Sequence, residues 1–154
     1  MQESKQNIQH DSALNAVCDS KLKNLLQSSK TIAILGLSPD SNKPSFKVAK
    51  FLQERSYKIL PIYPKGGTIL GVNAYTSLQE AFEAEERIDI LNVFRKSEAL
   101  FGIAQEVLML KNPPQCVWVQ LGLQSAQAKE TLEGAGIAYV ENLCIKLEYE
   151  RLFG

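Results

Sequence analysis

The sequence contains few of the side chains that enzymes most often use as nucleophiles or metal ligands. Its 154 residues include three cysteines and one histidine, His10, which lies in a polar N-terminal stretch. Cys18, Cys116 and Cys144 are far apart and form no C-x-x-C pair, so we expect free thiols in a reducing compartment. With no histidine partner to activate a thiolate, the composition predicts no catalytic cysteine and no metal site.

The chain also lacks an excess charge of either sign. Lysine plus arginine number 17, as do aspartate plus glutamate, so the formal net charge is zero. This excludes the broad positive field on which non-specific nucleic-acid binding depends, and any anion site must be local. The first ten residues lack the apolar core of a signal peptide, and no later segment is long enough to cross a bilayer. We therefore expect a cytoplasmic protein that binds neither nucleic acid nor membrane.

Apolar side chains make up 45% of the sequence, which is enough to form the core of one globular domain. Residues 1–19 are polar and rich in Asn, Gln and Ser, and we expect them to be a poorly ordered extension. The remaining residues, 20–154, are predicted to form the folded domain.

Short apolar runs alternate with segments of helical periodicity along this domain. The strands are predicted at Thr31–Gly36, Tyr57–Ile62, Ile88–Val93, Cys116–Gln120 and Ile137–Val140, with a weaker candidate at Ile69–Val72. Helices are predicted from Pro44, Ser77, Ser97, Ser125 and Asn142, with a capping box at Ser77 and a cap at Ser97. This alternation predicts an α/β fold: a Rossmann-like, doubly wound, mostly parallel sheet with helices on both faces.

The first strand leads into the most informative stretch of the chain. The run Thr31–Leu35 ends at Gly36 and continues through a loop rich in Ser, Pro and Asn to the helix that starts near Pro44. A strand, a tight turn and a helix in this order form an anion-binding site, because the first N–H groups of a helix have no partner inside it. The helix dipole adds partial positive charge, so a phosphate is the expected ligand.

Other parts of the chain are expected to meet at this turn. In a doubly wound sheet the ligand crevice lies at the carboxyl ends of the strands, where the strand order reverses. With the common order 3-2-1-4-5-6, the Gly36 loop faces Phe94 and Arg95, and Lys65 borders the same crevice. Ser38, Lys43, Lys65 and Arg95 would then converge, and several cations beside a helix N-terminus suit a ligand with several phosphates.

The sequence does not match the pattern of a standard NAD-binding site. Such a site requires G-x-G-x-x-G after the first strand and an acidic residue at the end of the second. Here only Gly36 of that pattern is present, and the second strand ends in Pro-Ile-Tyr-Pro, which Lys65 follows. A missing acid and a nearby lysine favour an adenosine ribose that carries a phosphate, which both NADP and coenzyme A (CoA) contain.

Six motifs in order resemble those of a known family. They are Ile34-Leu35-Gly36-Leu37-Ser38-Pro39, Pro61-Ile62-Tyr63-Pro64-Lys65, Ile69-Leu70-Gly71, Asp89-Ile90-Leu91-Asn92-Val93-Phe94-Arg95, Trp118-Val119-Gln120-Leu121-Gly122 and Cys144-Ile145-Lys146. The resemblance is to the small stand-alone CoA-binding domain proteins, which are similar to the N-terminal domain of the succinyl-CoA synthetase alpha subunit. It covers about Leu22 to Leu152 and implies a Rossmann-like fold that binds CoA.

The resemblance also implies roles for individual residues. Gly36, Leu37 and Ser38 would face the CoA pyrophosphate, with Lys43 near the phosphates and Lys65 near the adenosine. Phe94 and Arg95 would line the channel, and Val119 and Gln120 match the strand end over which the pantetheine arm runs in the larger enzymes. The chain lacks the ligases' second domain and its phosphorylated histidine, so the resemblance implies binding without ligase activity.

Three functions therefore compete at this point. The first is binding of CoA or an acyl-CoA without catalytic chemistry of the chain's own. The second is an NADP-dependent reductase with a degenerate glycine loop. The third is a protein that docks to a partner through its terminal helix and keeps the cleft only as a vestige.

Overall fold

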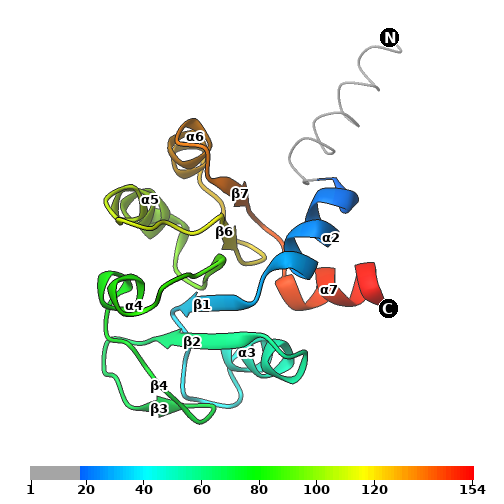
Figure 1. Ribbon diagram of the computed structural model, residues 1–154, viewed down its shortest axis with the longest axis vertical. Helices are drawn as coiled ribbons and strands as arrows, with labels where there is room; N and C mark the ends of the chain where they lie inside the picture. Colours follow the sequence, from blue (N-terminus) through cyan, green and yellow to red (C-terminus); the bar gives the residue numbers. More distant parts are fainter. Residues whose placement is uncertain (1–17) are drawn as a thin grey trace.

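A computed structural model describes residues 18–154 of the protein. The polar extension expected over residues 1–19 lies almost wholly outside the described residues. The centre of the fold is a parallel five-stranded sheet of order β2-β1-β5-β6-β7 (Figure 1). Its strands are β1 Thr31–Leu35, β2 Lys58–Ile62, β5 Ile90–Val93, β6 Cys116–Val119 and β7 Ala138–Val140. The predicted α/β, Rossmann-like fold is confirmed.

Helices cover both faces of the sheet. One face packs against α2 Asp19–Ser28, α3 Pro44–Glu54 and α7 Ile145–Phe153, and the other against α4 Leu78–Ala84, α5 Leu100–Leu108 and α6 Ala126–Gly134. Successive strand residues point to opposite faces of the sheet. Ile32 and Ile34 therefore pack in the core under α2, α3 and α7, whereas Ala33 and Leu35 pack in the core under α4, α5 and α6. All four side chains are buried, which explains why the sequence of β1 is a continuous apolar run.

The strand order differs from the 3-2-1-4-5-6 arrangement. After β2 the chain forms an antiparallel hairpin, β3 Thr68–Ile69 and β4 Val72–Asn73, where one short strand was expected. Its two-residue turn, Leu70–Gly71, has positive φ at both positions, as a type I′ turn requires. Only Tyr75 then pairs with β2, through a single parallel bridge to Ile62. The order is therefore that of flavodoxin-like folds, and the switch point remains between β1 and β5.

Most helix starts follow the sequence signals. Pro44 occupies the first turn of α3, and the Ser77 and Ser125 side chains accept hydrogen bonds from N–H groups at the starts of α4 and α6. The prediction that Ser97 caps α5 is wrong. Ser97 begins a short 3-10 turn, η1 Ser97–Ala99, and its hydroxyl instead accepts the backbone N–H of Gln124 at 3.1 Å.

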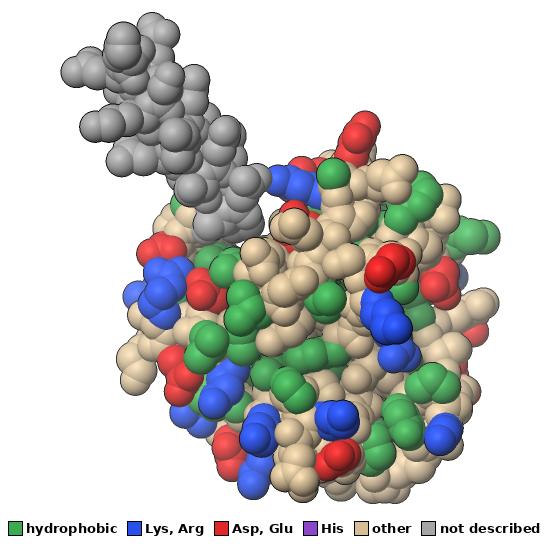
Figure 2. Space-filling model, turned by 180° about the vertical axis from the view of Figure 1, so that it is seen from behind, with side chains coloured by type: hydrophobic (Ala, Val, Ile, Leu, Met, Phe, Trp, Pro, Cys, Tyr) green, Lys and Arg blue, Asp and Glu red, His purple; other side chains and the backbone are tan. Residues whose placement is uncertain are grey.

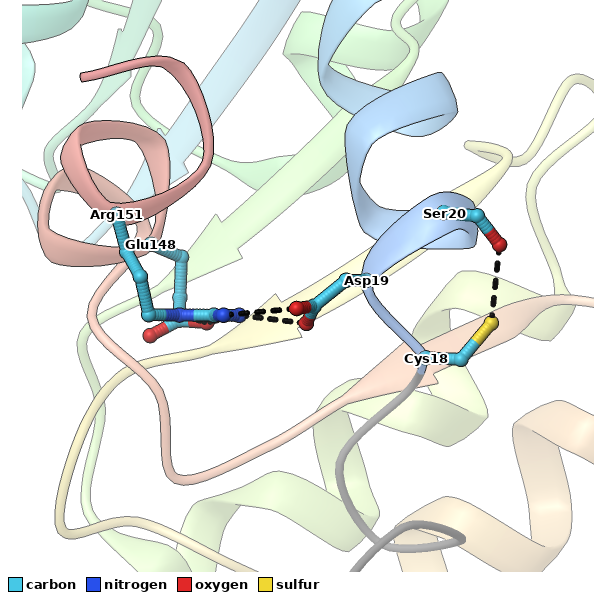
Figure 3. A network of polar contacts seen from close by, with 5 residues as sticks. All are labelled: Cys18, Asp19, Ser20, Glu148 and Arg151. Carbon is cyan, nitrogen blue, oxygen red and sulfur yellow. Dashed lines mark hydrogen bonds and ion pairs between the residues drawn. The ribbon is translucent and has the colours of Figure 1, made fainter.

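The two ends of the described chain lie side by side (Figures 1 and 3). Arg151 on α7 donates two hydrogen bonds, of 3.0 and 2.8 Å, to the carboxylate of Asp19 on α2, and two more to Glu148. These contacts hold the Asp19 pKa below its usual value, mainly through the hydrogen bond to the guanidinium. The pair joins the first and last described helices across one face of the sheet.

Candidate functional site

Gly36 directly follows β1, next to the ends of β2 and β5. Its N–H donates to the Ile62 carbonyl of β2, and the neighbouring Leu35 carbonyl accepts the N–H of Phe94 after β5. The φ angle of Gly36 is +89°, and a Cβ at this position would lie 2.2 Å from the Phe94 carbonyl oxygen. A glycine is therefore required here for both its backbone conformation and its lack of a side chain.

The loop after Gly36 is held by its own hydrogen bonds. The Ser38 N–H donates to the hydroxyl of Ser45 at 3.0 Å, and the Ser38 hydroxyl accepts the N–H of Asp40. The Asp40 carbonyl in turn accepts the N–H of Lys43 at 3.0 Å. Many of the loop's donors are thus used internally, and these bonds fix the entry of the chain into α3.

The N-terminus of α3 supplies the donors for an anion. Lys43 is its N-cap and makes no side-chain capping bond, and Pro44 has no N–H. The N–H groups of Ser45 and Phe46 precede the first intrahelical bond, which runs from Lys47 to the Lys43 carbonyl. The first turn carries no acidic side chain, so the positive end of the helix dipole is not offset within that turn.

Two of the three predicted cations lie at this turn. The Arg95 guanidinium lies beside Gly36, with Nη1 3.3 Å from the position that a Cβ would take there, and Lys43 is the N-cap of α3. Lys65 is exposed in the turn after β2, which is closed by a hydrogen bond from the Gly66 N–H to the Tyr63 carbonyl. The Lys65 side chain makes no described contact with Arg95 or Gly36. Within residues 18–154 none of these three cations forms an ion pair, so their charges are available to a ligand.

Two predicted site residues direct their side chains into the core. Leu37 and Val119 are both fully buried, on opposite faces of the sheet. A ligand could therefore reach them only through their backbone. The Phe94 ring, by contrast, is partly exposed and packs at the edge of the core that contains Leu37.

Two amide side chains near the same strand ends have a buried oxygen that accepts no hydrogen bond. Asn92 is fully buried in β5 and donates from Nδ2 to the Trp118 carbonyl, which leaves its Oδ1 unpaired. Gln120, just after β6, has a buried Oε1 that no described donor reaches. Buried acceptors of this kind cost free energy until a donor pairs with them.

Sequence reasoning missed Ser45 and Asn92. Ser45 follows Pro44 in the first turn of α3, where a hydroxyl can hydrogen-bond back to the preceding loop. Asn92 is the one uncharged polar residue in the apolar run Ile88–Val93, and that contrast is the signal that could have identified it.

The described cysteines offer no activated thiol near this turn. Burial raises the pKa of the Cys116 thiol to about 12, which keeps it protonated at neutral pH. Cys144 is also buried, and Cys18 is exposed on α2. No group of three His, Cys, Asp or Glu side chains among residues 18–154 could hold a metal ion. His10 lies outside the described residues.

Comparison with known proteins identifies the family. The model of the CoA binding domain family matches residues 30–150, which include every predicted site residue. The chain belongs to the CoA-binding domain family. A relative supports this assignment: the chain is 40% identical to YneT of Bacillus subtilis over 129 residues, which cover 84% of this chain and 92% of YneT.

Solved structures share the fold of this CoA-binding domain. One, from Thermus thermophilus, is 37% identical with a TM-score of 0.81 and covers 89% of this chain and 100% of its own. Another, from Pyrococcus horikoshii OT3, is 27% identical with a TM-score of 0.82, over 91% and 95% of the two chains. These matches span nearly the whole length of both neighbours, so the domain is similar to small proteins that stand alone. No helix in residues 18–154 is long and apolar enough to cross a membrane.

Proposed function

We propose that this domain binds CoA, free or acylated, across the carboxyl ends of β1 and β5, without catalytic chemistry of its own. The observation that carries the proposal is the start of α3, where the Ser45 and Phe46 N–H groups have no intrahelical partner and the first turn has no acidic side chain. Such donors bind a phosphate, and the Arg95 guanidinium beside Gly36 adds a positive charge to the same side of the loop.

Each part of CoA has a counterpart in the chain. The pyrophosphate would rest on the N–H groups of Ser45 and Phe46, with Lys43 and Arg95 on either side. Lys65 would attract the phosphate of the adenosine ribose, in the position where an NAD site carries an acid. The reach of a flexible lysine is enough for this role without a contact to the other cations.

The pantetheine arm would leave this cleft along Phe94 towards Gln120 and the backbone of Val119. Pantetheine contains two amides, whose N–H groups are donors of the kind that Gln120 Oε1 lacks. An arm that passes the end of β6 would therefore satisfy this acceptor if the partly exposed Gln120 side chain turns its Oε1 outwards when the ligand binds. The acyl group, if present, would lie beyond this point.

Calorimetric titration of the purified chain with CoA and with NADP tests the proposal. We expect CoA to bind and NADP to bind much more weakly or not at all. Arg95→Ala removes a charged hydrogen bond of about 1.5 to 3 kcal/mol, so CoA affinity should fall about tenfold to a hundredfold. Lys50→Ala, which removes an exposed charge from the middle of α3, serves as the matched control and should leave the affinity unchanged. Equal binding of NADP, or equal losses in both variants, would contradict the proposal.

A further inference from the structure

A cavity of about 600 Å³ lies between α4 and the C-terminal end of α5, on the side of the sheet opposite α3 and α7. Helix α5 starts just after Arg95, at the carboxyl edge, and ends near the amino edge, where β6 begins. The cavity is thus separated from the Gly36 turn by the length of a helix, and nothing in the proposed CoA site uses it.

The floor of this cavity is apolar and its rim is acidic. Leu78 and Phe82 form the floor from α4, and Leu110 joins them from the segment after α5. The rim carries four glutamates and one lysine, so it is negative although the whole chain is neutral. The lining glutamates are Glu83, Glu85, Glu86 and Glu106, and the lysine is Lys111.

Two of the four glutamates on the rim have hydrogen-bond or ion-pair partners in the described part of the chain, and two do not. Glu85 is paired with Lys58 and accepts the Tyr75 hydroxyl, and Glu83 accepts an amide N–H of Gln79. Glu86 and Glu106 have no partner among residues 18–154. Because α4 and α5 both end here, the negative ends of their dipoles face the same opening. Figure 2 shows acidic and basic side chains interspersed over the side of the molecule that it presents.

A large apolar side chain is exposed at the same opening. Met109 lines the cavity with 87% of its surface exposed. A flexible thioether adapts its shape to a partner, and exposed apolar side chains beside a groove are typical of binding surfaces.

We propose that this α4–α5 groove docks a basic amphipathic segment of a partner protein. One apolar side chain of that segment would enter between Phe82 and Leu110 and contact Met109. Lys or Arg side chains on its flanks would pair with Glu86 and Glu106. The unpaired charges of Glu86 and Glu106 beside an apolar floor are complementary to a segment that carries both apolar and basic side chains, and this favours such a partner. The proposal does not depend on CoA.

A designed peptide tests this surface with the full chain. The probe is a helical peptide of leucine and lysine, and its control carries glutamate in place of lysine. We expect fluorescence anisotropy to show binding of the lysine peptide alone, weakened about tenfold by Glu86→Gln with Glu106→Gln. Met109→Ala should also weaken binding, and its exposure means that folding is unaffected. Amide resonances of α4 and α5, rather than those near Gly36, should shift on binding.

The matched control removes two exposed glutamates from the opposite face, with Glu54→Gln and Glu150→Gln. Equal weakening in this control would show attraction by overall charge and overturn the proposal. So would equal binding of both peptides, or resonance shifts elsewhere. Self-association of the chain that the groove variant abolishes would assign the surface to a second copy and overturn it as well.

Discussion

Gly36 and Phe94 approach each other so closely that no side chain fits between them. A Cβ on Gly36 would lie 2.2 Å from the Phe94 carbonyl oxygen and 3.3 Å from Nη1 of Arg95. The two residues directly follow the adjacent strands β1 and β5, at the switch point of the sheet. This contact places the Arg95 guanidinium beside the turn that follows β1.

Gly36→Ala should destabilise the fold and abolish CoA binding. The substitution forces a side chain into positive φ and against a backbone carbonyl, which we expect to cost about 2 to 4 kcal/mol. Urea denaturation measures the loss. Gly102→Ala is the control, because Gly102 lies within α5 with nothing within 4 Å of its Cβ position. That variant should gain about 0.5 to 1 kcal/mol, and a similar gain for Gly36→Ala would refute the steric argument.

Lys65 is expected to recognise the phosphate on the adenosine ribose. Lys65→Ala should therefore weaken CoA binding about threefold to tenfold, while binding of 3′-dephospho-CoA stays unchanged. Calorimetric titration of the unmodified chain and of Lys65→Ala, each with CoA and with 3′-dephospho-CoA, gives a thermodynamic cycle. This cycle isolates the interaction between Lys65 and the ribose phosphate. If Lys65→Ala weakens the two ligands equally, the lysine does not contact that phosphate.

Gln120→Leu removes the unpaired acceptor at the end of β6. We expect it to weaken CoA about fivefold to tenfold through the lost amide hydrogen bond, and to leave adenosine 3′,5′-bisphosphate, which has no pantetheine arm, unaffected. The free energy of unfolding of the Gln120→Leu variant should not fall, because the buried Oε1 makes no described hydrogen bond that could be lost. An unchanged affinity for CoA would remove Gln120 from the site.

Asp89 makes the stability of the domain depend on pH. Burial raises the pKa of its carboxyl, but hydrogen bonds from the Lys30 and Thr31 N–H groups and from Arg87 outweigh burial and leave the pKa below 3.8. Because the folded pKa is depressed, the stabilisation is present above about pH 4 and lost as the pH falls below it.

Asp89→Asn should therefore lower stability by about 2 kcal/mol at pH 7 and flatten the decline between pH 5 and pH 3. Urea denaturation at several pH values measures both effects. Glu130→Gln, on the exposed side of α6, should change neither. An Asp89→Asn protein that keeps the full pH dependence would show that other groups cause it.

The sequence predicted the parts of the fold that local patterns determine. β1 and β5 are buried on both faces and read as apolar runs, and Pro44 and Ser77 mark the helix starts where the structure has them. Ser97 was assigned wrongly because a serine before a helical stretch looks the same whether its hydroxyl caps that helix or accepts the distant N–H of Gln124.

The rest depends on contacts between distant segments. The hairpin around Leu70 has too few residues for periodicity to separate it from one short strand, and its turn uses Leu where Asn is typical. The rule that ligand sites lie at the carboxyl ends of parallel strands predicted Gly36 and Arg95 at one edge of the sheet. In the structure these two residues are adjacent. It gave no sign that the Leu37 and Val119 side chains face the core, because an apolar residue after a strand suits either environment.

A crystal structure of the chain grown with CoA tests the central claim most directly. We predict pyrophosphate density against Gly36, within hydrogen-bonding distance of the Ser45 and Phe46 N–H groups and the Arg95 guanidinium. CoA bound elsewhere, or a Gly36 turn that remains empty at saturating CoA, would contradict the account.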